Sequence, residues 1–195
     1  MKNILMIGTG GTIASELSEG ALSPALGAEQ LLRLVPDVSR MCDADAVQLF
    51  ELDSTDIMPE HWIRIADEII RRYDDYDGFV IAHGTDTMAY TASALSYLIQ
   101  NSRKPIVLTG AQKPIGFETT DSKQNLSDSF LCAASGMAGV LVVFGGQVLL
   151  GTRARKTRSK SFSAFSSPNY PPLATVQNGR MALYFDPTEG ETHFC

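Results

Sequence analysis

The segment Asn3-Ile4-Leu5-Met6-Ile7-Gly8-Thr9-Gly10-Gly11-Thr12 sets the pattern that the rest of the chain repeats. An uninterrupted apolar run ends in small and hydroxylated residues. This indicates a strand over 3–8 that is buried on both faces and leads into a tight turn. Four more apolar or β-branched runs follow, at 46–52, 78–81, 105–108 and 139–144. Continuous runs of this kind are typical of the strands of a parallel sheet.

Helical periodicity fills most of the gaps between these runs. Four segments have apolar residues at helical spacing: around 62–70 after Pro59, 88–100, 126–134 and, more weakly, after Ala28. For the third of them, Asp121 or Ser122 is the expected N-cap and Gly136 the expected stop. The alternation of strands and helices predicts an α/β fold, with a three-layer, doubly wound and mainly parallel sheet.

The pattern changes after residue 144. Gly145-Gly146 predicts a tight turn, so we expect a β-hairpin over 139–150. The residues that follow are a basic stretch (153–160), a Ser/Pro-rich loop (159–172) and a last strand (181–185). We therefore expect one domain over 1–185 and a polar linker or tail over 186–195.

Composition excludes several classes of protein. The 195 residues are 44% hydrophobic and 19% charged, which fits one globular domain rather than a disordered chain. A net charge of −6 argues against a broad attraction to nucleic acid or to an anionic membrane. The longest apolar run, 139–144, is too short to cross a bilayer, and the apolar stretch 4–7 is no secretory signal. We expect a cytoplasmic protein.

Cysteine and histidine spacing argues against a metal site. Cys42, Cys132 and Cys195 are far apart and form no CxxC pair. The three histidines also lack the spacing of ligands. Neither a zinc knuckle nor a thioredoxin-type site is expected.

Polar residues gather directly after the predicted strands. Four loops carry hydroxyls, carboxylates or glycines: Thr9-Gly10-Gly11-Thr12, Asp53-Ser54-Thr55-Asp56, His83-Gly84-Thr85-Asp86-Thr87 and Thr109-Gly110-Ala111-Gln112. Because the carboxyl ends of parallel strands meet at one edge of a sheet, these loops predict a compact polar pocket.

A nucleotide site fits this pocket poorly. Gly8-x-Gly10 resembles the start of a dinucleotide fingerprint, but the third glycine position is Ile13 and no suitably spaced acidic residue follows. The chain has no GK[ST] motif for a P-loop. Gly8 reads as part of a tight turn, whereas Gly10-Gly11 would leave backbone N–H groups free to face a ligand.

The residues of the pocket leave a threonine hydroxyl as a possible, intrinsically weak nucleophile. There is no GxSxG elbow and no Cys–His pair. A threonine hydroxyl needs a base to take its proton and donors to hold the oxyanion. Asp86 could orient a lysine base, and the candidates are Lys156 and Lys160. The rest of the basic run reads as a solvated loop; a nucleic-acid patch is a weaker alternative, because aromatic residues are not interleaved with it.

Two motifs resemble the signatures of the bacterial-type L-asparaginase family. They are Thr9-Gly10-Gly11-Thr12-Ile13-Ala14 and His83-Gly84-Thr85-Asp86-Thr87-Met88, each directly behind a predicted strand. The resemblance continues through 53–56, 108–111, 121–126 and 151–156. Residues 161–171 are similar to the cytoplasmic type I branch in particular.

The resemblance implies hydrolysis of L-asparagine to L-aspartate and ammonia, without a cofactor. Thr12 matches the family's nucleophile, which forms an acyl-enzyme with the side-chain amide carbon. Thr85, Lys156 and Asp86 match a second constellation, a threonine activated by lysine and held by aspartate.

The same resemblance implies how the substrate is held. Ser54, helped by Thr55, would bind the α-carboxylate, and Asp86 would meet the α-ammonium group. Ala111 would offer its backbone carbonyl to the amide nitrogen. Independently of the resemblance, we expect Gly11 among the substrate-binding residues, because the backbone amides around it could supply the donors that hold the oxyanion.

Other polar and aromatic residues of these motifs read as structural. We expect Thr9 to be a turn hydroxyl and His83 to position its loop through both ring nitrogens. We expect Asn125 to bond backbone near the sheet, and Trp62 to lie in the core. Asp53 and Asp56 are alternatively helix caps.

The chain departs from the family pattern in two ways. Relatives often carry a tyrosine on the mobile loop after the first motif, and 15–27 contains none. The family also has a smaller C-terminal domain and forms homo-oligomers, dimers or tetramers, whereas this chain corresponds to the N-terminal catalytic domain. The alternatives are therefore a related glutamine amidohydrolase, such as one component of a tRNA amidotransferase, or a fragment that binds an amino acid without turnover.

Overall fold

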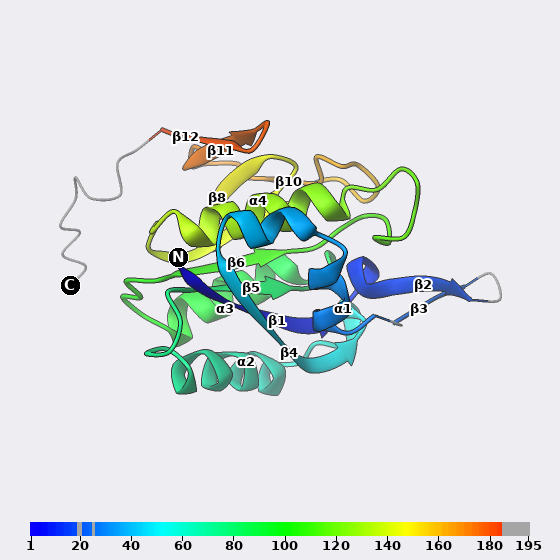
Figure 1. The fold of residues 1–195 in the computed structure, drawn as a ribbon, viewed down its shortest axis with the longest axis horizontal. Helices are drawn as coiled ribbons and strands as arrows, with labels where there is room; N and C mark the ends of the chain where they lie inside the picture. Colours follow the sequence, from blue (N-terminus) through cyan, green and yellow to red (C-terminus); the bar gives the residue numbers. More distant parts are fainter. Residues whose placement is uncertain (19–20, 25, 185–195) are drawn as a thin grey trace.

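The structure, a computed structural model, describes residues 1–18, 21–24 and 26–184. One mixed sheet dominates it, with strands β4, β1, β5, β6 and β7 parallel and three further strands antiparallel (Figure 1). In chain order the strands are β1 (Asn3–Gly10), β4 (Asp43–Leu52), β5 (Gly78–Ala82), β6 (Pro105–Thr109), β7 (Gly139–Phe144), β8 (Gln147–Leu150), β11 (Ala174–Gln177) and β12 (Arg180–Leu183). Their order across the sheet is β12-β11-β8-β7-β6-β5-β1-β4.

Four α-helices cover the two faces of this sheet. They are α1 (Ala28–Arg33), α2 (Pro59–Arg71), α3 (Met88–Leu98) and α4 (Ser122–Ala134). Successive strand residues point to opposite faces. Ile4 and Met6 thus join a core with α1 and α4, while Leu5 and Ile7 join a core with α2 and α3. The three layers and the mainly parallel sheet confirm the predicted α/β fold.

The predicted hairpin is also present. β7 pairs antiparallel with β8, with Phe144 opposite Gln147, so the turn falls at Gly145-Gly146 as expected. The strand predicted at 181–185 is β12, which ends at Leu183. Residue 185 and the expected tail over 186–195 lie outside the described residues.

β4 differs from the expectation that it is buried on both faces. It begins three residues earlier than predicted, at Asp43, and most of its side chains stay half-exposed or exposed. The cause is its place at the edge of the sheet, where β1 is its one partner among the described strands. An edge strand has solvent along one side, which the sequence run alone does not reveal.

Several short elements were absent from the sequence-based expectation. Residues after the first motif form a β-ribbon of β2 (Ser15–Ser18) and β3 (Ala21–Pro24) instead of a plain loop. β11 was not predicted, nor were β9 (Arg155–Lys156) and β10 (Phe165–Ser166) in the basic and Ser/Pro-rich segments. The chain also has 3₁₀ turns at η1 (Thr12–Ala14), η2 (Pro36–Arg40), η3 (Ser54–Asp56) and η4 (Gly151–Arg153). These pieces are too short to show a period in sequence.

Within the described part of the chain, no helix has the length and apolar character needed to cross a membrane.

Candidate active site

The loops after β1, β4 and β5 touch at the carboxyl edge of the sheet, and glycines make this approach possible. Gly11 has a φ of 81°, and a Cβ on it would lie 2.4 Å from both Cα and N of Gly84. A Cβ on Gly84 would in turn lie 2.6 Å from the Cβ of Ser54. Backbone can pack this closely where no side chain intervenes. Thr12 follows Gly11 in the chain, and Thr85 follows Gly84. The contacts between the glycines therefore bring the two threonines to the same place as Ser54.

Lys156 completes the centre of this cluster. Its Nζ donates to Thr85 Oγ1 at 2.8 Å and lies 2.6 Å from Asp86 Oδ1. The Thr85 residue is 6% exposed, and the Lys156 side chain is 16% exposed although Asp86 is largely open to solvent. A neutral amine at this position would take the proton of the Thr85 hydroxyl, and the Asp86 carboxylate orients that amine.

The fold delivers Lys156 to this place through a small antiparallel pair. Lys156 on β9 lies opposite Phe165 on β10, and the Phe165 ring packs on Phe144 with centroids 4.9 Å apart. The N–H of Thr157 donates to the carbonyl of Ala164 at 2.8 Å, which closes the intervening loop. The other basic side chains of the run are exposed, as the reading of a solvated loop predicted: Arg153, Arg155, Arg158 and Lys160.

Ser54 contacts the residues that directly precede α3. Its Oγ accepts from the N–H of Asp86 at 3.2 Å, and its carbonyl accepts from Thr87 Oγ1 at 2.6 Å. The Ser54 residue is buried. Because its Oγ acts here as an acceptor, the hydroxyl proton remains available to donate to an anion.

Thr55 is placed differently from Ser54. It is exposed, and its hydroxyl donates to Asp53 Oδ1 at 2.7 Å. The same oxygen accepts from the Thr55 N–H at 2.8 Å, so Asp53 caps η3, in line with the alternative reading of that residue. These hydrogen bonds, led by the backbone N–H, hold the pKa of Asp53 below its usual value. Asp56 caps neither η3 nor α2 in the part of the chain that the structure describes.

Thr12 begins the 3₁₀ turn η1 and is half-buried. Within residues 1–18, 21–24 and 26–184, no group forms a hydrogen bond with its hydroxyl. The expectation that the Gly11 N–H faces a ligand is wrong. This N–H donates to the carbonyl of Leu52 at 3.0 Å. The bond connects the first motif with the end of β4, so the N–H is not free for a ligand.

A directed chain of hydrogen bonds supports the Thr85 loop from behind. His83 Nδ1 lies 2.7 Å from the carbonyl of Gly84, and His83 Nε2 lies 3.0 Å from Thr91 Oγ1. A carbonyl only accepts, so Nδ1 carries the proton and Nε2 accepts from Thr91. The Thr91 hydroxyl then accepts from the indole N–H of Trp62 at 3.0 Å.

These hydrogen bonds confirm that both ring nitrogens of His83 position the loop. His83 is fully buried, and burial lowers its pKa to about 4, which keeps the ring neutral near neutral pH. Trp62 does not lie in the core as expected. It is half-buried, and its indole N–H reaches inward to the fully buried Thr91 on α3. The expectation that Thr9 is a turn hydroxyl is wrong in place: Thr9 belongs to β1, and its hydroxyl donates to the carbonyl of Ala82 at the end of β5 at 3.0 Å.

Asp121 holds the loop that contains Ala111. It occupies the N-cap position of α4, but its side chain does not cap the helix as we expected. Its carboxylate accepts from the N–H of Gln112 at 3.0 Å and from the N–H of Lys113 at 3.1 Å. The loop offers these donors in a better position than the first turn of α4. Ala111 itself is buried.

Asn125 completes this support, and the prediction that it bonds backbone near the sheet is confirmed. Its Nδ2 donates to the carbonyl of Gly110 at 2.9 Å, and its Oδ1 accepts from the N–H of Gly145 at 3.0 Å. One side chain thus connects the loop after β6 with the β7–β8 turn.

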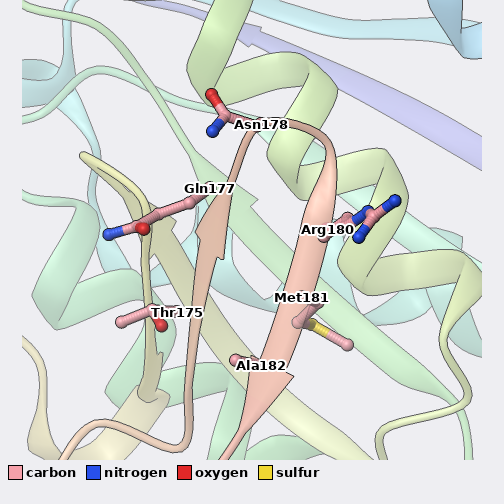
Figure 2. A pocket seen from close by; sticks show the side chains of 6 residues that line it. All are labelled: Thr175, Gln177, Asn178, Arg180, Met181 and Ala182. Atoms are coloured by element: carbon pink, nitrogen blue, oxygen red, sulfur yellow. The ribbon is translucent and has the colours of Figure 1, made fainter.

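Other regions of the described chain offer less chemistry. No three or more His, Cys, Asp or Glu side chains cluster there in a way that could hold a metal ion. A cavity of about 540 Å³ lies on the β11–β12 hairpin, where Figure 2 shows Thr175 and Gln177 on one side and Arg180 on the other. It contains no acid, histidine or cysteine, so we do not assign the chemistry to it.

Comparisons with known proteins show which proteins the chain is similar to. The family model described as "Asparaginase, N-terminal" matches residues 3–189. L-asparaginase 1 of Escherichia coli K12 is 43% identical over 177 residues, with 88% of this chain and 52% of that protein covered. One component of the glutamyl-tRNA(Gln) amidotransferase of Pyrococcus abyssi is 39% identical over 186 residues, with 90% and 42% covered.

The solved structure of the thermostable L-asparaginase from Thermococcus kodakarensis has the same fold. It superposes with a TM-score of 0.89 at 40% identity, and the match covers 97% of this chain and 58% of that one. The chain spans about half the length of the curated relatives it matches.

Proposed function

The chain belongs to the asparaginase family, and from that membership we propose that it hydrolyses the side-chain amide of L-asparagine to L-aspartate and ammonia. The observation that carries the proposal is the contact of Lys156 Nζ with both Thr85 Oγ1 and Asp86 Oδ1, at 2.8 and 2.6 Å. A base, a hydroxyl and an orienting carboxylate in contact form the arrangement that proton transfer during amide hydrolysis requires.

Thr12 is the nucleophile of the proposed reaction. Its hydroxyl oxygen attacks the side-chain amide carbon and forms an acyl-enzyme, while the amide nitrogen gains a proton and leaves as ammonia. Water then attacks the ester carbon and returns the proton to the Thr12 oxygen, which releases aspartate. The half-buried and unpartnered state of the Thr12 hydroxyl within the described residues supports this role.

Thr85 and Lys156 transfer the protons in both steps. The lysine amine accepts the proton of Thr85, and the Thr85 oxygen relays a proton between the reacting groups. Asp86 stabilises the ammonium form of Lys156 when it carries the extra proton. Such a relay contributes roughly 10²–10⁴ in rate.

Charged groups of the substrate meet matching partners. The Ser54 hydroxyl donates to the α-carboxylate, with Thr55 as a weaker helper because its hydroxyl is bonded to Asp53. The exposed side of Asp86 accepts from the α-ammonium group, and the backbone carbonyl of Ala111 accepts from the amide nitrogen. We further propose a cytoplasmic homo-oligomer, in which residues of a neighbouring copy would complete the substrate site.

Thr12→Ala is the direct test, with ammonia release from L-asparagine as the readout. We expect the rate to fall by at least about 10⁴-fold, because removal of a nucleophile removes the covalent path. The melting temperature should hardly change, since the half-buried hydroxyl makes no bond to the described residues. Thr119→Ala, which removes an exposed hydroxyl, is the matched control and should keep full activity.

Equal activity of Thr12→Ala and the unaltered chain would refute Thr12 as nucleophile. A well-folded chain that releases no ammonia from L-asparagine would contradict asparaginase activity in these 195 residues. L-glutamine belongs in the same assay, because the similarity to an amidotransferase component favours a glutamine amidohydrolase as the second candidate. Faster ammonia release from L-glutamine than from L-asparagine would select it.

A further inference from the structure

A second cavity of about 540 Å³ lies between α4, the β7–β8 turn and the tip of the β11–β12 hairpin. Figure 1 shows this hairpin beside the α4 side of the sheet, and Figure 2 labels Asn178 at its turn. Thr12, Ser54, Thr85 and Lys156 do not line the cavity. It is therefore separate from the centre assigned to amide hydrolysis.

Asp128 is the unusual group in its wall. The residue is 2% exposed, and its Oδ1 accepts from Gln124 Nε2 at 2.7 Å. Its Oδ2 is buried and has no hydrogen-bond donor in the described part of the chain. A buried carboxylate oxygen without a donor is costly, and such groups in native proteins usually meet a partner.

Asp121 lines the same cavity, and its carboxylate oxygens have the hydrogen-bond donors that Asp128 Oδ2 lacks within the described residues. It accepts from two backbone N–H groups, those of Gln112 and Lys113, and from Asn125 Nδ2 at 3.2 Å. Asp128 has one neutral amide donor by comparison. Burial raises the pKa of Asp128 to about 6, so near neutral pH it is mostly ionised while lacking a compensating charge.

An aromatic ring supplies a second feature that attracts cations. Phe162 lines the cavity, and Lys113 Nζ lies 5.7 Å from the centroid of its ring. That distance is within the range of a cation–π contact. Lys113 forms no ion pair with Asp128, so the chain's own ammonium group leaves the carboxylate unpaired within the described residues.

The size and the donor set of the cavity favour an organic cation over a metal ion. A divalent metal ion such as Ca²⁺ takes six or more oxygen ligands and prefers several carboxylates among them. Among the residues described, no three acids, histidines or cysteines come together here. A volume of about 540 Å³ instead lies in the range of pockets for small molecules.

We propose that this cavity binds a small organic cation through its ammonium or guanidinium group, with Asp128 as the counter-ion and the Phe162 ring as a cation–π partner. Asn178 and Gln124 line the same space and can bond polar groups at the ligand's other end. The site is independent of the reaction proposed above, because it uses none of the residues assigned to it.

The test compares n-butylammonium with the neutral n-butanol by ligand-observed NMR titration of the 195-residue chain. We expect saturable binding of the ammonium ion, with a Kd of order ~1–10 mM, and at least about tenfold weaker binding of the alcohol. Asp128→Asn keeps the size and the Gln124 contact but removes the charge, and should weaken n-butylammonium binding at least about tenfold. Asp74→Asn, which neutralises an exposed acid, is the matched control and should leave binding unchanged.

Phe162→Leu keeps the measurement decisive if Asp128→Asn does not fold. Loss of the ring should weaken n-butylammonium binding by about two- to fivefold. Equal affinity for the ammonium ion and the alcohol overturns the proposal. The same is true of undiminished binding by Asp128→Asn, or of no saturable binding by the unaltered chain up to about 50 mM.

Discussion

The two threonines at the centre of the site stand in opposite surroundings. Thr85 is buried, receives a hydrogen bond from Lys156, and follows a loop that His83, Thr91 and Trp62 hold from behind. Thr12 lies half-buried on a 3₁₀ turn, and no described group bonds its hydroxyl.

This difference separates two requirements of amide hydrolysis. A proton relay needs donors and acceptors that are already in line, because misalignment by a fraction of an ångström weakens each transfer. A nucleophile needs an oxygen that is free to move onto the substrate carbon. The Thr85 region is built for the first requirement and the Thr12 region for the second.

After Thr12→Ala, the largest effect should follow from breaking the Thr85 relay at its base. Lys156→Met keeps the apolar stem but removes the amine, and should lower kcat for ammonia release by about 10²- to 10⁴-fold. KM should change much less, because the amine touches Thr85 and Asp86 rather than the substrate's α-carboxylate. Steady-state assays against L-asparagine measure both constants.

Lys160→Met is the matched control, since that lysine belongs to the same basic run and is exposed. Its kcat should match that of the unaltered chain. A similar loss in the two variants would mean that the run acts through its summed charge rather than through one placed amine.

An intermediate effect should appear in acid, through His83. Its pKa is about 4 in the folded chain, below the ordinary 6.5, so the unfolded chain binds more protons between these two values. The stability that comes from keeping His83 neutral is complete above pH 6.5 and is lost as pH falls towards 4. About 3 kcal/mol should be lost in this way.

The measurement is urea unfolding at several pH values for the unaltered chain and for His83→Gln. The difference between the two isolates His83. This matters because Asp128, whose pKa is raised to about 6, acts with the opposite sign in much of the same window. A difference that does not change between pH 6.5 and 4 would contradict the buried neutral ring.

The smallest effect should come from the far end of the same chain of hydrogen bonds. Trp62→Phe removes the donor to Thr91 while it keeps an aromatic ring, and should cost about 0.5–1.5 kcal/mol of unfolding free energy. We expect kcat to fall by less than about fivefold, since Thr91 can still donate to His83.

Urea unfolding followed by circular dichroism measures the stability of this variant, because Trp62 is the sole tryptophan of the chain. Tyr97→Phe, at an exposed position of α3, is its control and should be neutral. An unchanged stability of Trp62→Phe would show that the indole N–H adds nothing to the Thr85 loop.

Sequence reasoning succeeded where local pattern and global fold agree. Buried strands such as β1 and β5 are continuous apolar runs, and the loops after them carry the polar residues. Because parallel strands share one carboxyl edge, the meeting of the first and second motifs was predictable without coordinates. The role of Asn125 followed from the same placement.

Sequence reasoning failed where partners are distant and the element is short. β9 and β10 have two residues each, and their pairing depends on Phe165 packing against Phe144. Trp62 was predicted to lie in the core because the residue type shows a large apolar ring. The sequence does not show which hydrogen-bond acceptor the indole N–H meets in the fold. Asp121 looked like a helix cap because the loop that attracts its carboxylate lies nine residues away from it.

The order of residues alone was sufficient to predict the α/β fold, the family, and the edge of the sheet at which the chemistry collects, because apolar periodicity and motif order are local properties of the chain. Packing in three dimensions was needed to establish how closely Lys156 meets Thr85, which ring nitrogen of His83 carries the proton, and that Asp128 is buried without a second donor in the described residues. Those facts depend on distances between segments up to 71 residues apart, and packing of the whole domain sets these distances.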